Sequence, residues 1–192
     1  RDQFAVELIQ IAKPGVQAPM QLTFAPDPKL EANNSGINEL INMMDKEHKG
    51  RTRAQQSADT MLSKVRVWEM REIARFSKEG LRRLFMSDAY KNIGERIIKI
   101  LEQELDYTIP EAILTHGSDL SGYYITHPLF GVCICELNIR TQTMNALFSR
   151  DVISLRELLV KDTNTLMRIR NFGQTCINEV DRELARIGLV RP

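Results

Sequence analysis

The spacing of apolar side chains predicts helices along most of the chain. Apolar residues recur at i, i+3, i+4 and i+7, the repeat of one face of an α-helix. In the most regular stretch, 88–105, Ile93, Ile97 and Leu101 share one face. In the first 114 residues the pattern predicts helices at about 4–12, 35–44, 54–78, 81–86, 88–105 and 110–114. A strand-like pattern is confined to "GVCICELNI", 131–139, so the predicted fold class is mostly α.

The last sixty residues predict four short helices with their own start and stop signals. A side-chain oxygen before a helix accepts a bond from a free backbone N–H, and a glycine after a helix favours its end. The predicted caps are Thr143, Ser154 in a capping box with Glu157, and Asp162 or Thr163, and Gly188 follows the last helix. The C-terminal part is therefore expected to be a compact four-helix domain.

Breaks in these patterns divide the chain into four segments. Residues 1–36 carry four prolines after a short helix and predict an extended segment. Residues 37–114 form a helical region. Residues 115–127, rich in glycine and serine, are the expected linker, and 128–192 form the C-terminal domain.

Composition and charge exclude several classes of protein. The net charge is +1 over 192 residues, whereas a nucleic-acid-binding domain is usually strongly basic. No apolar run approaches the roughly 18 residues that span a bilayer, so no membrane partner is expected. Three cysteines form no disulfide framework and predict a reducing compartment, either the cytoplasm or the matrix of a mitochondrion or plastid.

No catalytic or cofactor motif is present. The sequence has no phosphate-binding glycine loop, no HExxH and no Ser-His-Asp arrangement. Cys133-x-Cys135 is shorter than the usual zinc spacing and has no second pair, so buried thiols are the favoured interpretation. We expect no enzyme, metal, cofactor or small-molecule substrate.

The stretch "CELNIRTQTMNALFSRDVISLRELLVKDTNTLMRIRNFGQTCINEVDRELARIGL" resembles the C-terminal domain of the bacterial RNA polymerase alpha subunit. The family motifs are an "ELNL"-like entry, an "NAL" helix, an "SLxELL" helix and an "NFG" turn before the last helix. The resemblance covers about 128–192 and implies a compact helical domain with a helix-hairpin-helix-like element.

The family uses this domain to touch the DNA minor groove and to dock transcription factors. Asn145, Gly173 and Glu179 match positions that the family uses for DNA. The family's main DNA-contacting arginine is replaced by Gln142, and Arg140 stands two positions earlier.

The lysines and serine that follow the family's glycine are also absent. Gln174 and Thr175 replace two lysines, and Cys176 replaces the serine. Each lost cation removes counterion release, so binding of DNA in the family's manner is expected to be weak and sensitive to salt.

The Asn171-Phe172-Gly173 turn has two interpretations: it holds a phosphate, or it only joins two helices. Arg168, Arg170, Arg182 and Arg186 flank it. They either face a phosphate or pair with Glu179 and Glu183 at helical spacing.

Residues 46–83 are locally basic, with eleven Lys and Arg against five Asp and Glu. Trp68 in this segment stacks on a base or lies in a core or interface. The candidate phosphate contacts here are Arg51, Arg53, Arg66, Arg71, Arg75, Arg82 and Arg83.

These patterns favour a non-catalytic adaptor or structural subunit of a large nucleic-acid machine. Transcription is the first context, and a ribosome-like particle, organellar or not, is the second. The expected partners are protein subunits and an RNA or DNA backbone. The alternative is a sequence-tolerant DNA-binding protein that uses the C-terminal module.

Overall fold

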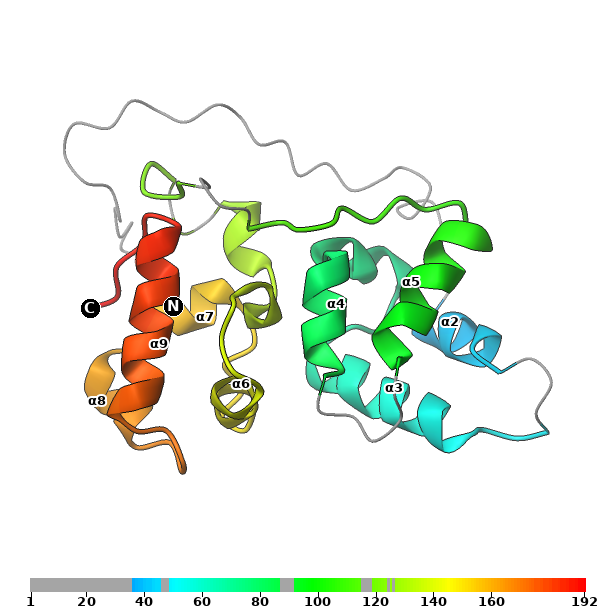
Figure 1. Ribbon diagram of the computed structural model, residues 1–192, viewed down its shortest axis with the longest axis horizontal. Coiled ribbons are helices and arrows are strands. Elements are labelled where there is room, and N and C mark those ends of the chain that lie inside the picture. The colour runs from blue at the N-terminus through cyan, green and yellow to red at the C-terminus, as the bar shows by residue number, and fades with distance from the viewer. Residues whose placement is uncertain (1–35, 46–48, 87–91, 115–118, 124, 126) are drawn as a thin grey trace, which may run out of the picture.

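A computed structural model describes residues 36–45, 49–86, 92–114, 119–123, 125 and 127–192. Two helical bodies lie side by side, joined by an extended segment (Figure 1). The first contains α2 (Ile37–Met43), α3 (Arg53–Lys64), the 3-10 helix η1 (Met70–Arg75), α4 (Lys78–Leu84) and α5 (Ile93–Gln103). The second contains η2 (Pro128–Gly131), η3 (Ile134–Glu136), α6 (Thr141–Phe148), α7 (Leu155–Leu159), α8 (Thr163–Met167) and α9 (Gln174–Arg186).

The mostly α fold is confirmed. The described residues contain only isolated bridges, Gly36 with Glu69 and Cys133 with Ser154, and no longer strand. In the strand-like stretch 131–139, pairing stops at the single Cys133–Ser154 bridge, where Ile134 N–H bonds to Ile153 O and Leu155 N–H to Val132 O. The chain then turns into η3, in which Glu136 N–H bonds to Cys133 O and Leu137 N–H to Ile134 O.

A single hydrophobic cluster runs through both bodies. Its fully buried side chains include Leu40, Phe76 and Ile97 in the first body and Phe130, Leu147 and Leu184 in the second. Burial of such side chains is the main favourable contribution to folding. The two bodies therefore share apolar packing as well as polar contacts.

The predicted helix 54–78 is wrong in its middle. The helix α3 ends at Lys64, and Arg66 takes a left-handed conformation with φ 59°. The Val67 N–H then bonds to Leu62 O at 2.9 Å, which closes the helix end and buries Val67. This end has arginine where glycine is usual, so the sequence carries no ordinary stop signal there.

The predicted short helix at 110–114 is also absent, because its backbone caps another helix. The first free N–H groups of α4 bond outward, Lys78 N to Pro110 O at 3.0 Å and Glu79 N to Glu111 O at 3.1 Å. The Gly80 N–H bonds to the Ser77 hydroxyl at 3.0 Å. The extended segment thus satisfies a helix N-terminus that Ser77 alone would not.

The capping signals of the second body are largely confirmed. Ser154 and Glu157 form a capping box on α7, and Asp162 caps α8. Thr143 is not a cap: α6 begins two residues earlier, and Thr143 is buried.

Several predicted features lie outside the described residues. They are the 4–12 helix, the extended segment up to residue 35 and the beginning of the 88–105 helix. The described α5 starts at Ile93, and α2 starts after Gly36. Residues 119–123 of the expected linker pack on the end of α9, where Leu120 N–H bonds to Ile187 O at 2.8 Å.

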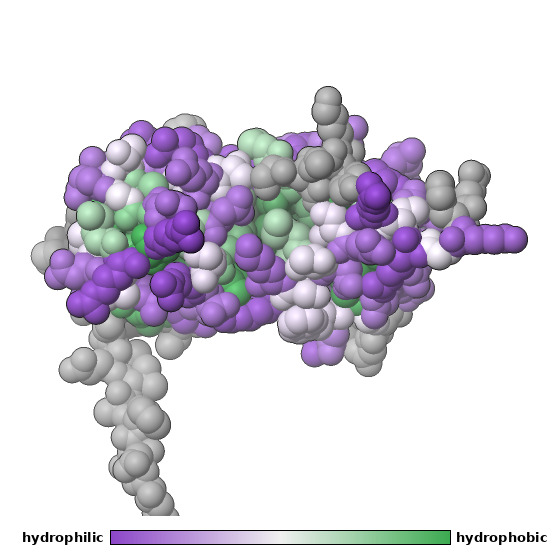
Figure 2. All heavy atoms as spheres, turned by 90° about the horizontal axis from the view of Figure 1, so that it is seen from below, coloured by the Kyte–Doolittle hydropathy of each residue, from purple (hydrophilic) through white to green (hydrophobic). Residues whose placement is uncertain are grey.

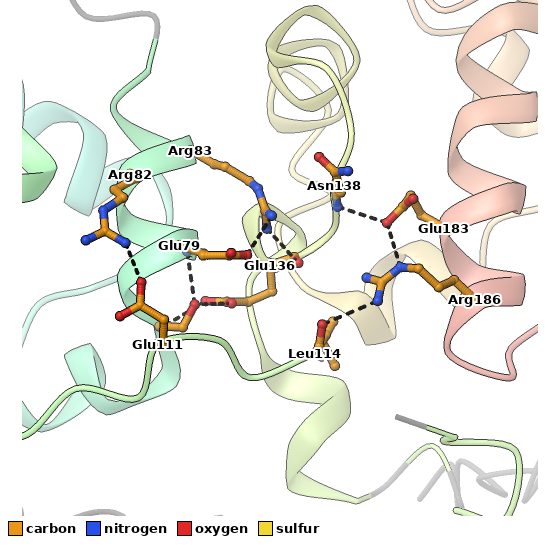
Figure 3. A network of polar contacts seen from close by, with 11 residues as sticks. Glu79, Arg82, Arg83, Glu111, Leu114, Glu136, Asn138, Glu183 and Arg186 are labelled. Carbon is orange, nitrogen blue, oxygen red and sulfur yellow. Dashed lines mark hydrogen bonds and ion pairs between the residues drawn. The ribbon is translucent and has the colours of Figure 1, made fainter. Parts of the chain in front are cut away.

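A buried carboxylate connects the two bodies. Glu136 of η3 accepts bonds from the Ser77 backbone N–H at 2.8 Å and the Ser77 hydroxyl at 2.6 Å. Arg83 of α4 donates to the Glu136 carbonyl at 3.0 Å and to Glu79 at 2.7 Å (Figure 3). Burial raises the pKa of Glu136, although the bonds from Ser77 oppose that rise. These contacts hold both ends of α4 against η3.

The described helices include none long and apolar enough to cross a membrane. Cys133, Cys135 and Cys176 are buried free thiols, as their spacing predicted. Among the described residues no group of His, Cys, Asp and Glu is arranged to hold a metal ion.

Candidate nucleic-acid interface

A surface groove of about 860 Å³ lies between the end of α4 and the N-terminal ends of α6 and α9. Its charged lining residues are Arg83, Arg140, Arg182 and Glu179. Its neutral lining residues are Met86, Asn138, Ile139, Thr141, Gln142, Met144, Thr175 and Asn178. The groove therefore combines residues of both helical bodies, and the predicted sites Arg83, Arg140, Gln142, Thr175 and Glu179 meet there.

Two carboxylates on α9 fix the backbone that leads into this groove. Glu179 accepts the Arg140 N–H at 2.8 Å, and Glu183, one turn later, accepts the Asn138 N–H at 3.1 Å. Both are buried, so they are more than partners for the arginines around the turn. Their role is to position the 138–140 backbone at the start of α6.

Glu179 is held as a carboxylate by three donors. The Thr143 hydroxyl donates at 2.6 Å, and Arg140 donates through its backbone N–H and its guanidinium Nε. Burial favours a higher pKa for Glu179, but these hydrogen bonds outweigh burial and hold its pKa below the ordinary value. The resemblance assigned Glu179 to DNA contact, whereas here its oxygens are engaged within the protein itself.

Arg140 remains available for a ligand despite this pairing. Its Nε lies 3.2 Å from Glu179, and its side chain is 56% exposed. Gln142 is exposed at the first turn of α6, and Asn145 is half-buried one turn later and outside the groove lining.

The turn before α9 is exposed at Asn171, Gly173, Gln174 and Thr175, while Phe172 is buried. Asn171 has φ 62°, which gives the turn its left-handed residue. Gly173 has φ −102°, and a Cβ built there meets no atom within 4 Å among the described residues. Neither backbone conformation nor internal packing thus requires glycine at position 173, but a glycine there leaves the backbone open to close approach by a ligand.

The four arginines around the turn behave differently from one another. Arg186 pairs with Glu183 at 3.1 Å, as the self-paired interpretation predicted. The side chains of Arg168, Arg170 and Arg182 are exposed and form no hydrogen bond or ion pair with the described residues. Only Arg182 of these three lines the groove.

The basic segment 46–83 is largely neutralised by ion pairs. Arg66 pairs with Glu157 of the second body at 2.6 Å, and Arg82 pairs with Glu95 and Glu111. The remaining pairs of the described residues in this segment are Arg51 with Asp59, Arg71 with Glu69, Arg75 with Glu72, Arg83 with Glu79 and Lys78 with Glu102 and Glu111.

Much of the positive excess of this segment in the sequence is therefore offset by acids that lie outside it. Arg53 is exposed without a partner among the described residues, and Trp68 is 57% exposed. Arg66 and Arg75 line one small pocket of about 210 Å³, but Glu157 lines it as well. The other arginines of the segment are dispersed in or next to α3, η1 and α4.

Apolar side chains contribute to the groove as well. Met86 is 67% exposed, and its sulfur accepts a bond from the Thr141 hydroxyl at 3.7 Å. Ile139 and Met144 add buried apolar lining. On the face shown in Figure 2, hydrophobic surface lies between two largely hydrophilic bodies.

Most of the groove could not be assigned from the sequence. Thr141 and Asn178 carry no motif signal, and Met86 belongs to the other helical body. Asn138 stands in the "ELNL"-like entry, but that motif assigned it no contact. For Arg182 the sequence left two interpretations open, a phosphate contact or an ion pair with a glutamate of α9. Only the packing of α9 against the start of α6 shows that Arg182 and Arg140 line the same groove.

Comparison with known proteins agrees with this geometry. Residues 126–186 match the family model that describes the carboxy-terminal domain of the alpha subunit of bacterial RNA polymerase. The DNA-directed RNA polymerase subunit alpha of Corynebacterium diphtheriae is 34% identical over 104 residues, which are 53% of this chain and 30% of the relative. The corresponding subunit of Corynebacterium jeikeium is 32% identical over 104 residues, again 53% of this chain and 30% of the relative.

The alpha subunit of Rhodopirellula baltica is 32% identical over 56 residues, 29% of this chain and 17% of the relative. The protein thus spans less than a third of the length of these curated relatives. No solved structure matches it significantly. The helices α6 to α9 and the turn before α9 thus lie in the stretch, residues 126–186, that matches the carboxy-terminal domain of the bacterial RNA polymerase alpha subunit.

Proposed function

We propose that this protein is a non-catalytic accessory subunit of a transcription complex, and that its groove contacts the sugar–phosphate backbone of DNA. The observation that carries the proposal is that three arginines line one groove: Arg83 from the end of α4, Arg140 from the start of α6 and Arg182 from the middle of α9. The alpha-subunit relatives favour transcription over the ribosome-like particle.

The helix ends add to the attraction of these cations. Within the C-terminal domain, α7 and α8 have side-chain caps, whereas α6 and α9 have none. Uncapped N–H groups at a helix N-terminus favour an anion such as a phosphate. Thr141, Gln142, Thr175 and Asn178 provide further neutral donors around them.

The strength of this contact is limited by the number of cations. Arg140 is shared with Glu179, Arg83 is shared with Glu79, and Gln174 and Thr175 carry no charge. If the three arginines neutralise three phosphates, a plot of the logarithm of the association constant against the logarithm of the salt concentration should have a slope of about −3. We therefore expect weak binding that depends on the rest of the complex for its affinity.

RNA binding through the 46–83 segment has less support. Its arginines are paired and dispersed, as described above, and exposed ion pairs must break before they can bind phosphate. A protein-only adaptor is the second candidate, and the exposed Met86 in the groove favours it.

A salt titration with matched variants tests these alternatives. Fluorescence anisotropy of labelled duplex DNA and of RNA hairpins is measured with the unchanged protein, with Arg182→Gln and with Lys99→Gln. Lys99 is an exposed control on α5, remote from the groove lining. The proposal expects Arg182→Gln to reduce the magnitude of the DNA slope by about 1 and Lys99→Gln to leave it unchanged.

Two results would contradict the DNA assignment. Equal slopes for the two variants would show that the groove is not the contact surface. Absence of duplex binding at low salt, where phosphate contacts are strongest, would favour the protein-only adaptor.

A further inference from the structure

A second surface of the C-terminal domain carries cations that the groove does not use. A pocket of about 430 Å³ opens between the loop after α6, the end of α7 and α8. Its rim carries Arg150, Lys161 and Arg168, and its apolar lining is Val152, Leu166 and Ile169. None of these residues lines the groove.

None of the three rim cations is neutralised by an ion pair with the described residues. Their side chains form no hydrogen bond with these residues either, and no carboxylate lines the pocket. Asp162 lies nearby, but it accepts the Thr165 N–H at 2.6 Å as the cap of α8. The bond from Thr165, with help from the charge of Arg168, holds the pKa of Asp162 below its usual value. One carboxylate that is already engaged leaves the rim positive.

Exposed apolar side chains stand next to these cations in the sequence. Val160 precedes Lys161 and is 50% exposed, and Met167 precedes Arg168 and is 45% exposed. They are two of the few large apolar side chains exposed among the described residues. A surface of this kind combines hydrophobic contact area with positive charge.

This combination distinguishes between two classes of anionic partner. The phosphates of a nucleic-acid backbone would pair with the cations, but the backbone has no apolar groups to pack against the apolar lining. An amphipathic helix with acidic and apolar side chains complements both, since apolar anchors enter a pocket while charges at its rim set orientation and specificity.

We propose that this pocket docks an acidic amphipathic segment of a partner protein. Its carboxylates contact Arg150, Lys161 and Arg168, and its apolar side chains lie against Val152, Leu166 and Ile169. This site is independent of the DNA groove, so the two can be occupied at once. The protein then links a nucleic acid on one side with an acidic protein segment on the other.

The test uses a fluorescein-labelled helical peptide of leucine and glutamate and a matched peptide of leucine and glutamine. Anisotropy is measured with the full-length protein and with the variant Arg150→Gln, Lys161→Gln, Arg168→Gln. Removing one exposed charge weakens such contacts about two- to fivefold, so the triple variant should weaken binding of the glutamate peptide about tenfold or more.

The controls separate this site from the groove. Arg182→Gln should leave peptide binding unchanged, and the triple variant should leave duplex DNA binding unchanged. Equal affinity for the two peptides, or an unchanged affinity of the triple variant, would overturn the proposal. A triple variant that loses DNA binding and keeps peptide binding would show that the pocket serves nucleic acid.

Discussion

The contact between Gly80 and Glu136 predicts that Gly80→Ala destabilises the protein when Glu136 is present and stabilises it when Glu136 is replaced by alanine. A Cβ built on Gly80 would lie 2.0 Å from the Glu136 Oε1 and 2.6 Å from its Cδ. Atoms cannot approach so closely, so the buried carboxylate would have to move away from Ser77. Gly80→Ala should therefore lower the free energy of unfolding by about 1–3 kcal/mol, although alanine is the better helix former by about 1 kcal/mol.

Removing the carboxylate should reverse that effect. Glu136→Ala leaves the Ser77 N–H and hydroxyl, both fully buried, without their acceptor. An unsatisfied buried donor costs about 1–3 kcal/mol, and loss of the desolvated charge offsets part of this. We expect a net loss of about 2–4 kcal/mol, or about 4–16 °C in Tm for a protein of this size. In that background Gly80→Ala gains about 0.5–1 kcal/mol, because its methyl group enters space that the carboxylate has left.

Urea unfolding of the four proteins, followed by far-ultraviolet circular dichroism, completes a double-mutant cycle. The coupling between the two sites should reach at least about 1.5 kcal/mol. Effects that add to within about 0.5 kcal/mol would refute this account of how the two bodies are joined. So would a Gly80→Ala variant that is more stable than the unchanged protein.

Three further predictions test individual positions. Gly188→Ala should lower the free energy of unfolding in urea by more than about 1 kcal/mol, because φ is +77° and the new Cβ would lie 2.0 Å from the Asp119 Oδ1. Gly173→Ala, where the Cβ meets open space, should cost less stability and instead weaken duplex DNA binding. Equal stability losses for the two variants would contradict this. Glu179→Gln should lower Tm most at neutral pH. The pKa of Glu179 in the folded protein lies below its ordinary 4.5, so the carboxylate stabilises the fold fully above pH 4.5, and this stabilisation is lost as the pH falls through the folded pKa. A Tm deficit that is independent of pH would show that this linkage is absent. Trp68→Ser should change stability by no more than about 0.5 kcal/mol, since Trp68 is 57% exposed, and a larger loss in the same assay would indicate an apolar contact that its exposure hides.

Local signals predicted the ends of the C-terminal helices well. The Ser154 capping box and the Asp162 cap depend on hydrogen bonds within three residues, which the sequence specifies directly. The left-handed Gly188 follows from the same local rule. These elements needed no knowledge of the tertiary structure.

Features set by distant contacts could not be predicted in this way. Arg66 ends α3 in a left-handed conformation, and its side chain pairs with Glu157, which lies far along the sequence. The carbonyls of Pro110 and Glu111 cap α4 and so do not start a helix. In both places tertiary contacts override the local preference.

The candidate site shows the same limit. The motif identified Arg140, Gln142 and Thr175, but its charge pattern offered Glu179 and Glu183 only as partners for the arginines around the turn. The burial of these two glutamates beneath the 138–140 backbone depends on how α9 packs on the start of α6. The part of the groove supplied by α4, with Arg83 and Met86, has no counterpart in the motif and follows from the packing of the two bodies.

The central claim, that the groove between α4, α6 and α9 contacts DNA, is tested most directly by mapping amide chemical shifts. Duplex DNA is added at low salt to the isotope-labelled full-length protein. The account predicts that the largest changes fall at 138–142 and 174–178 and in the Arg83 and Arg182 side chains, and that they disappear on addition of salt. Largest changes in α2 and α3, or at the Arg150–Lys161–Arg168 pocket, would contradict it.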